Sequence, residues 1–181
     1  AAVLDLYQGT WAGTLTREET TDAFTDQAVF THPGRGVDGY TESKMNPAGS
    51  YMDMQWFSWT QIYPFIRGAN LAILKLTENE AGFDSSFTNR LLGEAYFMRG
   101  YFYSQLMRQY GGVVLTLSPF ALEDEAANPR ASFEQTINQI ISDIDQSITL
   151  LADAPVNKSR AHKITALALK ARVLTHAASD L

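Results

Sequence analysis

Several residue types and patterns that carry familiar chemistry are missing from this chain. It contains no cysteine, which excludes disulfides, thiolate metal sites and cysteine nucleophiles within it. No uninterrupted apolar run approaches the ~20 residues that a transmembrane helix needs. Neither G-x-G-x-x-G nor G-x-x-x-x-G-K-[ST] occurs, so the sequence offers no phosphate-binding loop. We therefore expect no cofactor.

Basic residues are also too few and too scattered to form a positive surface. The 14 Lys and Arg residues are outnumbered by 20 Asp and Glu residues, and they form no run. The net charge of −6 differs from the basic footprint of nucleic-acid-binding domains, so we expect no nucleic-acid partner. A length of 181 residues is enough for one domain with a sizeable core, and we interpret residues 1–181 as a single domain.

Helical periodicity is what the chain has in abundance. Apolar residues recur at helical spacing over residues 1–15, 51–76, 87–110, 131–152 and 159–179. The longest irregular segment between them is 16–49, and connections of that length are usually functional or disordered. Ser132 with Gln135 predicts a capping box, and Ser159 is expected to cap the last helix. The predicted fold class is all-α.

The helix predicted over 87–110 presents apolar residues on two sides, which indicates a layered helical array. Gly93 and Gly100 interrupt it, and we expect each to permit close approach of a neighbouring backbone. Gly111 follows as a stop that can adopt positive φ. The residues expected to be essentially buried are Phe102, Leu106, Ile140, Ile144 and Leu167. On the last helix the expected buried stripe is Ile164, Leu167, Ala168, Ala171 and Leu174.

The segment 94–115, EAYFMRGYFYSQLMRQYGGVVL, resembles the hallmark of the SusD/RagB family of surface glycan-binding lipoproteins. The family pattern is, loosely, E-A-x-x-x-R-A-x-x-Y-x-x-L-x-x-x-Y-G-x-V-P-L. The matching positions are Glu94, Ala95, Arg99, Gly100 in place of Ala, Tyr103, Leu106, Tyr110, Gly111, Val113 and Leu115. Val114 stands where the family usually has proline, a departure that affects the turn after the helix.

Three further segments are similar to the same family in the same order. They are WTQIYPFIRGAN at 59–70, PRASFEQTINQIISDIDQSITLL at 129–151 and SRAHKITALALKARVLTHAASDL at 159–181. The resemblance implies tetratricopeptide-like antiparallel helix pairs with long irregular loops. It also implies that this chain is an N-terminal portion of a longer one, and that any lipid-bearing cysteine lies before Ala1.

The titratable residues do not form a recognisable catalytic pattern. His32, His162 and His176 lack any metal-ligand spacing, so we interpret them as surface or packing residues and expect no metal. The acidic pairs and runs at 18–19 and 123–125 are interpreted as solvated loop charge, although paired carboxylates could hydrolyse a glycosidic bond at a suitable separation. Asp143 and Asp145 are interpreted as the polar flank of an isoleucine-rich helix.

Aromatic residues before and at the start of the 51–76 helix offer a better case for a ligand site. Sugar rings present apolar CH faces that stack on flat aromatic side chains, while a few polar groups orient them. Trp59 fits the buried stripe and is interpreted as core. The candidate ligand-binding residues, chosen by position and chemistry alone, are Arg35, Tyr40, Asn46, Tyr51 and Trp56.

The resemblance implies a non-enzymatic protein of the outer-membrane surface. It would bind a glycan or other nutrient and deliver it to a TonB-dependent, SusC-like transporter, with the membrane reached only through a lipid anchor outside this chain. Two alternatives remain at this point: a helical-repeat scaffold that binds peptides or proteins, and an all-α glycoside hydrolase with two converging carboxylates.

Overall fold

The computed structural model describes residues 3–7, 26–27, 29, 59–119, 129–156 and 159–179. These ranges contain four long helices and no strand: α4 Trp59–Glu78, α5 Ser85–Tyr110, α6 Phe133–Leu150 and α7 Lys163–Ala177. Residues 3–7 are also helical. The all-α prediction is confirmed, and the predicted ends of the last three helices are correct to within a few residues. The predicted start of the 51–76 helix lies outside the described residues.

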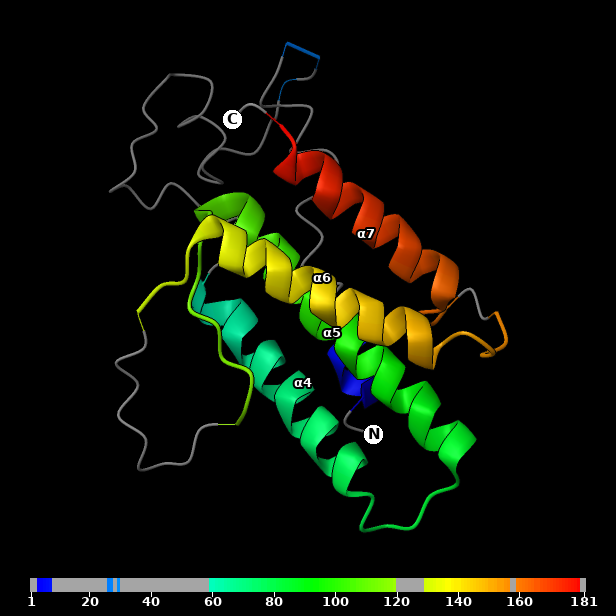
Figure 1. Ribbon diagram of the computed structural model, residues 1–181. Coiled ribbons are helices and arrows are strands. Elements are labelled where there is room, and N and C mark those ends of the chain that lie inside the picture. The colour runs from blue at the N-terminus through cyan, green and yellow to red at the C-terminus, as the bar shows by residue number, and fades with distance from the viewer. Residues whose placement is uncertain are drawn as a thin grey trace.

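Each helix packs beside the one that precedes it in the chain (Figure 1). α4 and α5 form one antiparallel pair joined by residues 79–84, and α6 and α7 form a second pair joined by 151–162. The two pairs meet where α5 packs against α6, and α5 also contacts α7. This arrangement confirms the predicted tetratricopeptide-like helix pairs and makes α5 the central helix of the array. None of the described helices is long and apolar enough to cross a membrane.

Side-chain caps begin three of these helices. The Asp84 carboxylate accepts a hydrogen bond from the Phe87 amide at the start of α5. The predicted capping box at the start of α6 is confirmed, with Ser132 and Gln135 bonding each other's backbone amides. The prediction that Ser159 caps α7 is wrong. His162 does so instead, and its ring accepts a hydrogen bond from the amide of the third helical residue.

The core lies where α4, α5 and α6 meet. Ile66 of α4 is fully buried there, and the aromatic ring of Phe102 stacks on that of Phe65 at 5.4 Å. Phe102, Leu106, Ile140 and Ile144 are all fully buried, as predicted from their helical spacing. The core is therefore assembled mainly around one face of α5 and the isoleucine stripe of α6.

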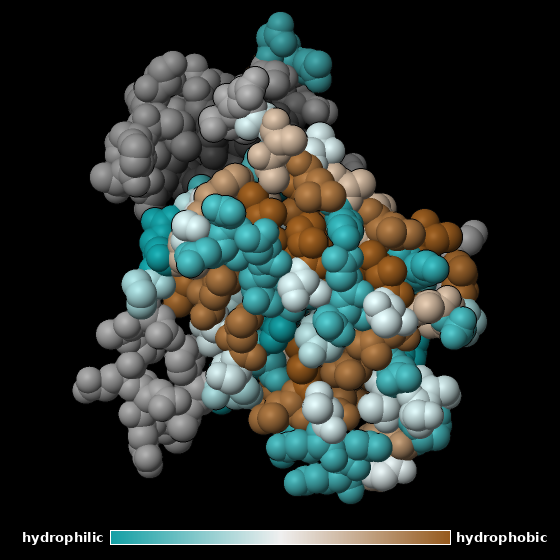
Figure 2. All heavy atoms as spheres, viewed as in Figure 1, coloured by the Kyte–Doolittle hydropathy of each residue, from teal (hydrophilic) through white to brown (hydrophobic). Residues whose placement is uncertain are grey.

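The predicted buried stripe of α7 is wrong, because that stripe faces outward. Leu167 is 46% exposed and Ile164 is 63% exposed, while the opposite stripe is buried. The residues that α7 buries are Ala166, Leu169 and Val173. Both faces of α7 are apolar at helical spacing, so the periodicity alone did not distinguish the face that meets α5 and α6. Figure 2 shows the outward stripe as hydrophobic residues along the surface over α7.

Three glycines allow α5 and the turn after it to lie close to α6. A Cβ added at Gly93 would lie 2.7 Å from Cγ of Leu151, and one at Gly100 would lie 3.2 Å from a side-chain carbon of Ile144. Close packing is found at both positions, but a backbone atom of α6 is among the neighbours only at Gly100, and the neighbours of Gly93 are side-chain atoms of Leu150 and Leu151. Gly111 ends α5 with φ of 70°, as expected, and a Cβ at Gly112 would lie 2.1 Å from a backbone oxygen.

Candidate functional site

The five ligand candidates chosen from the sequence lie outside the described residues. They are Arg35, Tyr40, Asn46, Tyr51 and Trp56. Their role as a ligand platform therefore stays a prediction. The same holds for His32 and for the acidic segments at 18–19 and 123–125.

The described residue nearest to these candidates in the sequence is Trp59, the first residue of α4. Its ring lies 4.9 Å from that of Tyr63 and 5.6 Å from that of Tyr110, with the second contact edge to face. The Arg130 guanidinium lies 5.9 Å from the indole centroid. Trp59 is half-buried against the core, so the core interpretation holds only in part.

Arg130 also fixes the turn that follows α5. Its Nε donates to the Gly112 carbonyl at 2.8 Å, and its Nη2 donates to the Tyr110 carbonyl. These two carbonyls belong to the Tyr-Gly-Gly stop, where no further helical amide follows to bond them. The aromatic cluster and the turn are thus tied to the segment that leads into α6.

A buried ion pair joins α5 to α6 at the centre of the array. Arg99 donates to both oxygens of Asp143, at 2.8 Å from Nε and 2.6 Å from Nη2. The same guanidinium donates to the Asn70 side chain of α4 at 2.9 Å. The interpretation of Asp143 as polar flank is wrong, since it is buried and paired, whereas Asp145 is exposed and pairs with Lys170.

The electrostatics of this pair follow from its burial and its geometry. Burial raises the pKa of the Asp143 carboxyl, while the hydrogen bonds and charge of Arg99 oppose that rise. Burial alone would lower the pKa of the Arg99 guanidinium, but hydrogen bonds and charge attraction to Asp143 raise it above its ordinary value. The bidentate geometry stabilises both charges, so we regard the pair as ionised.

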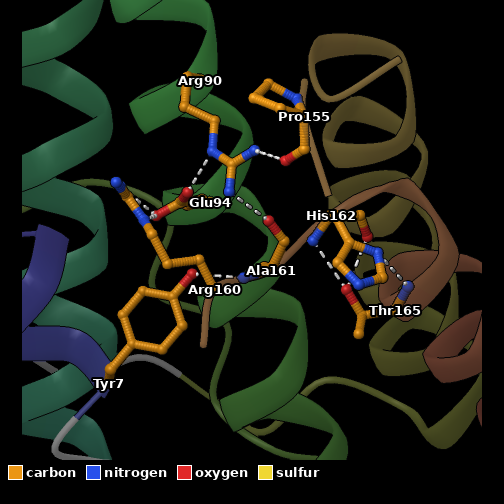
Figure 3. Close-up of polar contacts among 8 residues, drawn as sticks. All are labelled: Tyr7, Arg90, Glu94, Pro155, Arg160, Ala161, His162 and Thr165. Carbon is orange, nitrogen blue, oxygen red and sulfur yellow. Dashed lines mark hydrogen bonds and ion pairs between the residues drawn. The ribbon is translucent and has the colours of Figure 1, made fainter. Parts of the chain in front are cut away.

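A second buried carboxylate, Glu94, binds two arginines (Figure 3). Arg90, one turn earlier on α5, donates to Oε1 at 2.5 Å. Arg160, from the segment before α7, donates to Oε2 at 2.8 Å. The Glu94 side chain is fully buried, so the two guanidinium groups replace the water that would otherwise solvate its charge. Glu94 and Arg99 therefore each make charge-assisted contacts with a neighbouring element.

The Glu94 network also holds the connection between α6 and α7. Arg90 donates to the Pro155 carbonyl at 3.1 Å and to the Ala161 carbonyl at 3.0 Å. The Tyr7 hydroxyl accepts a hydrogen bond from the Ala161 amide at 2.7 Å. Burial is the main cause that raises the pKa of Tyr7 to about 12. The helical segment at 3–7 is therefore attached to the connection before α7.

The two ion-pair networks show that the buried carboxylates of Glu94 and Asp143 link neighbouring elements of the fold. Glu94 and Asp143 are held by arginines, so neither is placed as the general acid or base of a hydrolase. Among the described residues, no group of three or more metal-ligating side chains could hold a metal ion. His162 is used as a helix cap, and His176 is half-buried beside α5.

Two surface grooves flank α5, one near each end. The α5–α6 groove, of about 780 Å³, lies at the start of α5 and carries the half-exposed Phe87 among polar side chains. Its lining is Asp84, Ser86, Phe87, Asn89, Arg90, Thr149, Leu150, Asp153, Ala154, Pro155 and Arg160. An exposed ring beside hydroxyl, amide and charged groups is chemistry that suits a sugar.

The α5–α7 groove, of about 510 Å³, lies near the C-terminal ends of the two helices. Its lining is Ser104, Gln105, Met107, Arg108, Leu169, Arg172, Val173, Thr175, His176 and Ser179. Sequence reasoning did not find either groove, because each combines residues from distant segments.

The fold and these buried links define a tetratricopeptide-like helical protein whose pairs are joined by arginine–carboxylate contacts. A SusD-like family model described as "Starch-binding associating with outer membrane" matches residues 8–174. The chain belongs to this SusD-like family.

Individual relatives agree with the family match. The chain is 32% identical over 120 residues to SusD-like protein P38 of Formosa agariphila, an alignment that covers 66% of this chain and 23% of that protein. A SusD-like protein from Bacteroides fragilis superimposes with a TM-score of 0.71 at 25% identity, over 94% of this chain and 33% of that one. A laminarin-binding SusD-like protein superimposes with a TM-score of 0.69 at 20% identity, over 96% and 40%. The chain thus spans well under half the length of these relatives.

Proposed function

We propose that the protein containing this chain binds a glycan at the outer-membrane surface without cleaving it. The observation that carries this proposal is the family match over residues 8–174, whose description names starch binding and association with the outer membrane. The laminarin-binding protein of similar fold supports the same ligand class. Arginine pairing of the two buried carboxylates, Glu94 and Asp143, further favours binding over hydrolysis.

The second part of the proposal is delivery of the glycan to a TonB-dependent, SusC-like transporter. The protein would be a surface-exposed lipoprotein, held in the membrane only by a lipid anchor that lies before this chain. A stable complex with such a transporter should then be recovered from detergent-solubilised outer membranes. Recovery of the protein without any transporter, under conditions that preserve other outer-membrane complexes, would contradict delivery.

The ligand platform is proposed to be formed by aromatic residues of the segment before α4. Tyr40, Tyr51 and Trp56 would stack on sugar rings, while Arg35 and Asn46 would orient hydroxyl groups by hydrogen bonds. Loss of one stacking ring should weaken binding by on the order of 1 kcal/mol beyond simple area burial. Loss of Arg35 should weaken binding less, because it orients the sugar and contributes little buried area.

The test is calorimetric titration of the whole protein with neutral oligosaccharides, followed by chromatography of the recovered sugar. We expect weaker binding for Tyr40→Ala, Tyr51→Ala and Trp56→Ala with unchanged helical content. Phe133→Ala is the matched control, since Phe133 is 40% exposed at the start of α6 and lines neither groove. Shortened oligosaccharides after incubation would overturn the non-catalytic assignment. Parental affinity in all three loop variants would place the platform elsewhere.

A further inference from the structure

The α5–α7 groove gathers positive charge in a protein whose net charge is −6. Arg108 comes from α5, while Arg172 and His176 come from α7. The groove lining contains no carboxylate. The groove is therefore a positively charged recess on an acidic chain.

Three other arginines in the described ranges are paired with buried carboxylates. Arg90 and Arg160 bind Glu94, and Arg99 binds Asp143. By contrast, no described carboxylate lies within ion-pair distance of either groove arginine. Within the described residues, neither of these two guanidinium groups is neutralised by a carboxylate.

Burial raises the pKa of the Tyr101 hydroxyl, while the charges of Arg172 and, to a smaller extent, Arg108 oppose that rise. The electrostatic influence of both arginines therefore reaches Tyr101.

Stabilisation of helix ends explains only part of this arrangement. Arg108 lies in the last turn of α5, where its positive charge complements the helix dipole. Arg172 lies before the last turn of α7, which ends at Ala177, so the dipole gives no reason for its charge. A ligand does.

The groove offers polar groups besides its two arginines. Leu169, Val173 and Met107 form its apolar floor and are buried, at 7%, 2% and 2% exposure. Gln105, which is 4% exposed, places a side-chain amide among them, and its oxygen accepts a 3.4 Å hydrogen bond from Arg108. Thr175 and Ser179 add hydroxyl groups at the rim. A pyranose with an acidic substituent combines the surfaces that match this lining.

We propose that the α5–α7 groove binds an acidic sugar, with Arg108 and Arg172 holding its carboxylate or sulfate group. This inference rests on the proposed glycan-binding function and specifies its ligand class as an acidic glycan. Guanidinium groups favour such anions because they present several N–H donors in one plane. Binding should weaken as salt is added, since both arginines are exposed.

The experiment titrates the whole protein with oligosaccharides in matched pairs, carboxylated or sulfated against neutral, and with sodium sulfate alone. We expect the acidic member of at least one pair to bind more tightly. Arg108→Gln and Arg172→Gln should each weaken its binding about tenfold and leave the neutral member unchanged. Arg67→Gln is the matched control, because Arg67 is an exposed arginine of α4 that lines neither groove.

The remaining outcomes of this titration distinguish a failure of this inference from a failure of the proposed function. Equal binding of acidic and neutral members would overturn this inference and leave glycan binding intact. Binding of sulfate without any acidic sugar would overturn the assignment to a sugar. An equal loss of affinity in Arg67→Gln would reduce the effect to overall charge. Failure of every oligosaccharide to bind would overturn the proposed function together with this inference.

Discussion

Removing Arg99 should destabilise the fold more than removing any exposed charge. The side chains of Arg99 and Asp143 are 7% and 2% exposed, so loss of one partner leaves a buried, uncompensated charge on the other. Such changes cost about 3–5 kcal/mol in measured cases. Arg99→Ala also removes the donor to the Asn70 side chain. We therefore expect the free energy of unfolding to fall by about 3–5 kcal/mol, and the melting temperature by roughly 10 °C.

The pair itself is tested by replacing both partners. Arg99→Met with Asp143→Leu removes both charges and fills similar volume, a change that is often neutral or stabilising in other proteins. We expect the double variant to be more stable than Arg99→Ala by about 2 kcal/mol or more. Urea unfolding followed by circular dichroism at 222 nm measures each value. A loss below about 1 kcal/mol in Arg99→Ala would refute the reasoning, because it would mean that water solvates Asp143 in the variant.

Three further changes test the packing and the buried hydroxyl groups. Gly112→Ala should lower the free energy of unfolding by about 2 kcal/mol or more, because the added Cβ would lie 2.1 Å from a backbone oxygen. The neighbouring Gly111→Ala should cost about 1 kcal/mol, because Gly111 has positive φ. Equal melting temperatures of the two variants would contradict this. Leu169→Ala should cost about 2–5 kcal/mol, while Leu167→Ala, on the exposed stripe, should stay within about 0.5 kcal/mol in the same urea assay. Burial raises the pKa of Tyr7 from its ordinary value of 10.0 to about 12, so its contribution to stability should be fully present below pH 10 and be lost as pH rises through 12. Titration at 295 nm should show one fewer late-ionising tyrosine in Tyr7→Phe than in the parent. An unchanged titration curve would contradict this.

The sequence predicted the features that depend on local spacing. The Ser132–Gln135 box, the stop at Gly111 and the isoleucine stripe of α6 each follow from residues within a few positions of one another. Gly93 and Gly100 were also informative, because a glycine inside a strong helix has few explanations other than close packing.

The features that the sequence did not predict depend on which segments meet. Asp143 lies on an apolar helix, and only the fold brings Arg99 opposite it. The outward position of Leu167 depends on which of two apolar faces of α7 meets the array. Helix periodicity carries no information on either choice, because it describes each helix alone. The ligand platform proposed for the loop before α4 is of the same kind, since its geometry depends on contacts made by residues outside the described ranges.

The attachment of Tyr7 and Glu94 to the connection before α7 has a consequence for the order of folding. Tyr7 and Ala161 are separated by 154 positions, and Glu94 and Arg160 by 66. On the ribosome, α5 would emerge with Glu94 bound only to Arg90, and its second guanidinium would arrive after α6 had been synthesised. In most repeat arrays each unit contacts only its neighbours and can form independently. Here the first pair gains these contacts only after α6 and the connection before α7 have been synthesised, so its full stability should depend on contacts across most of the chain.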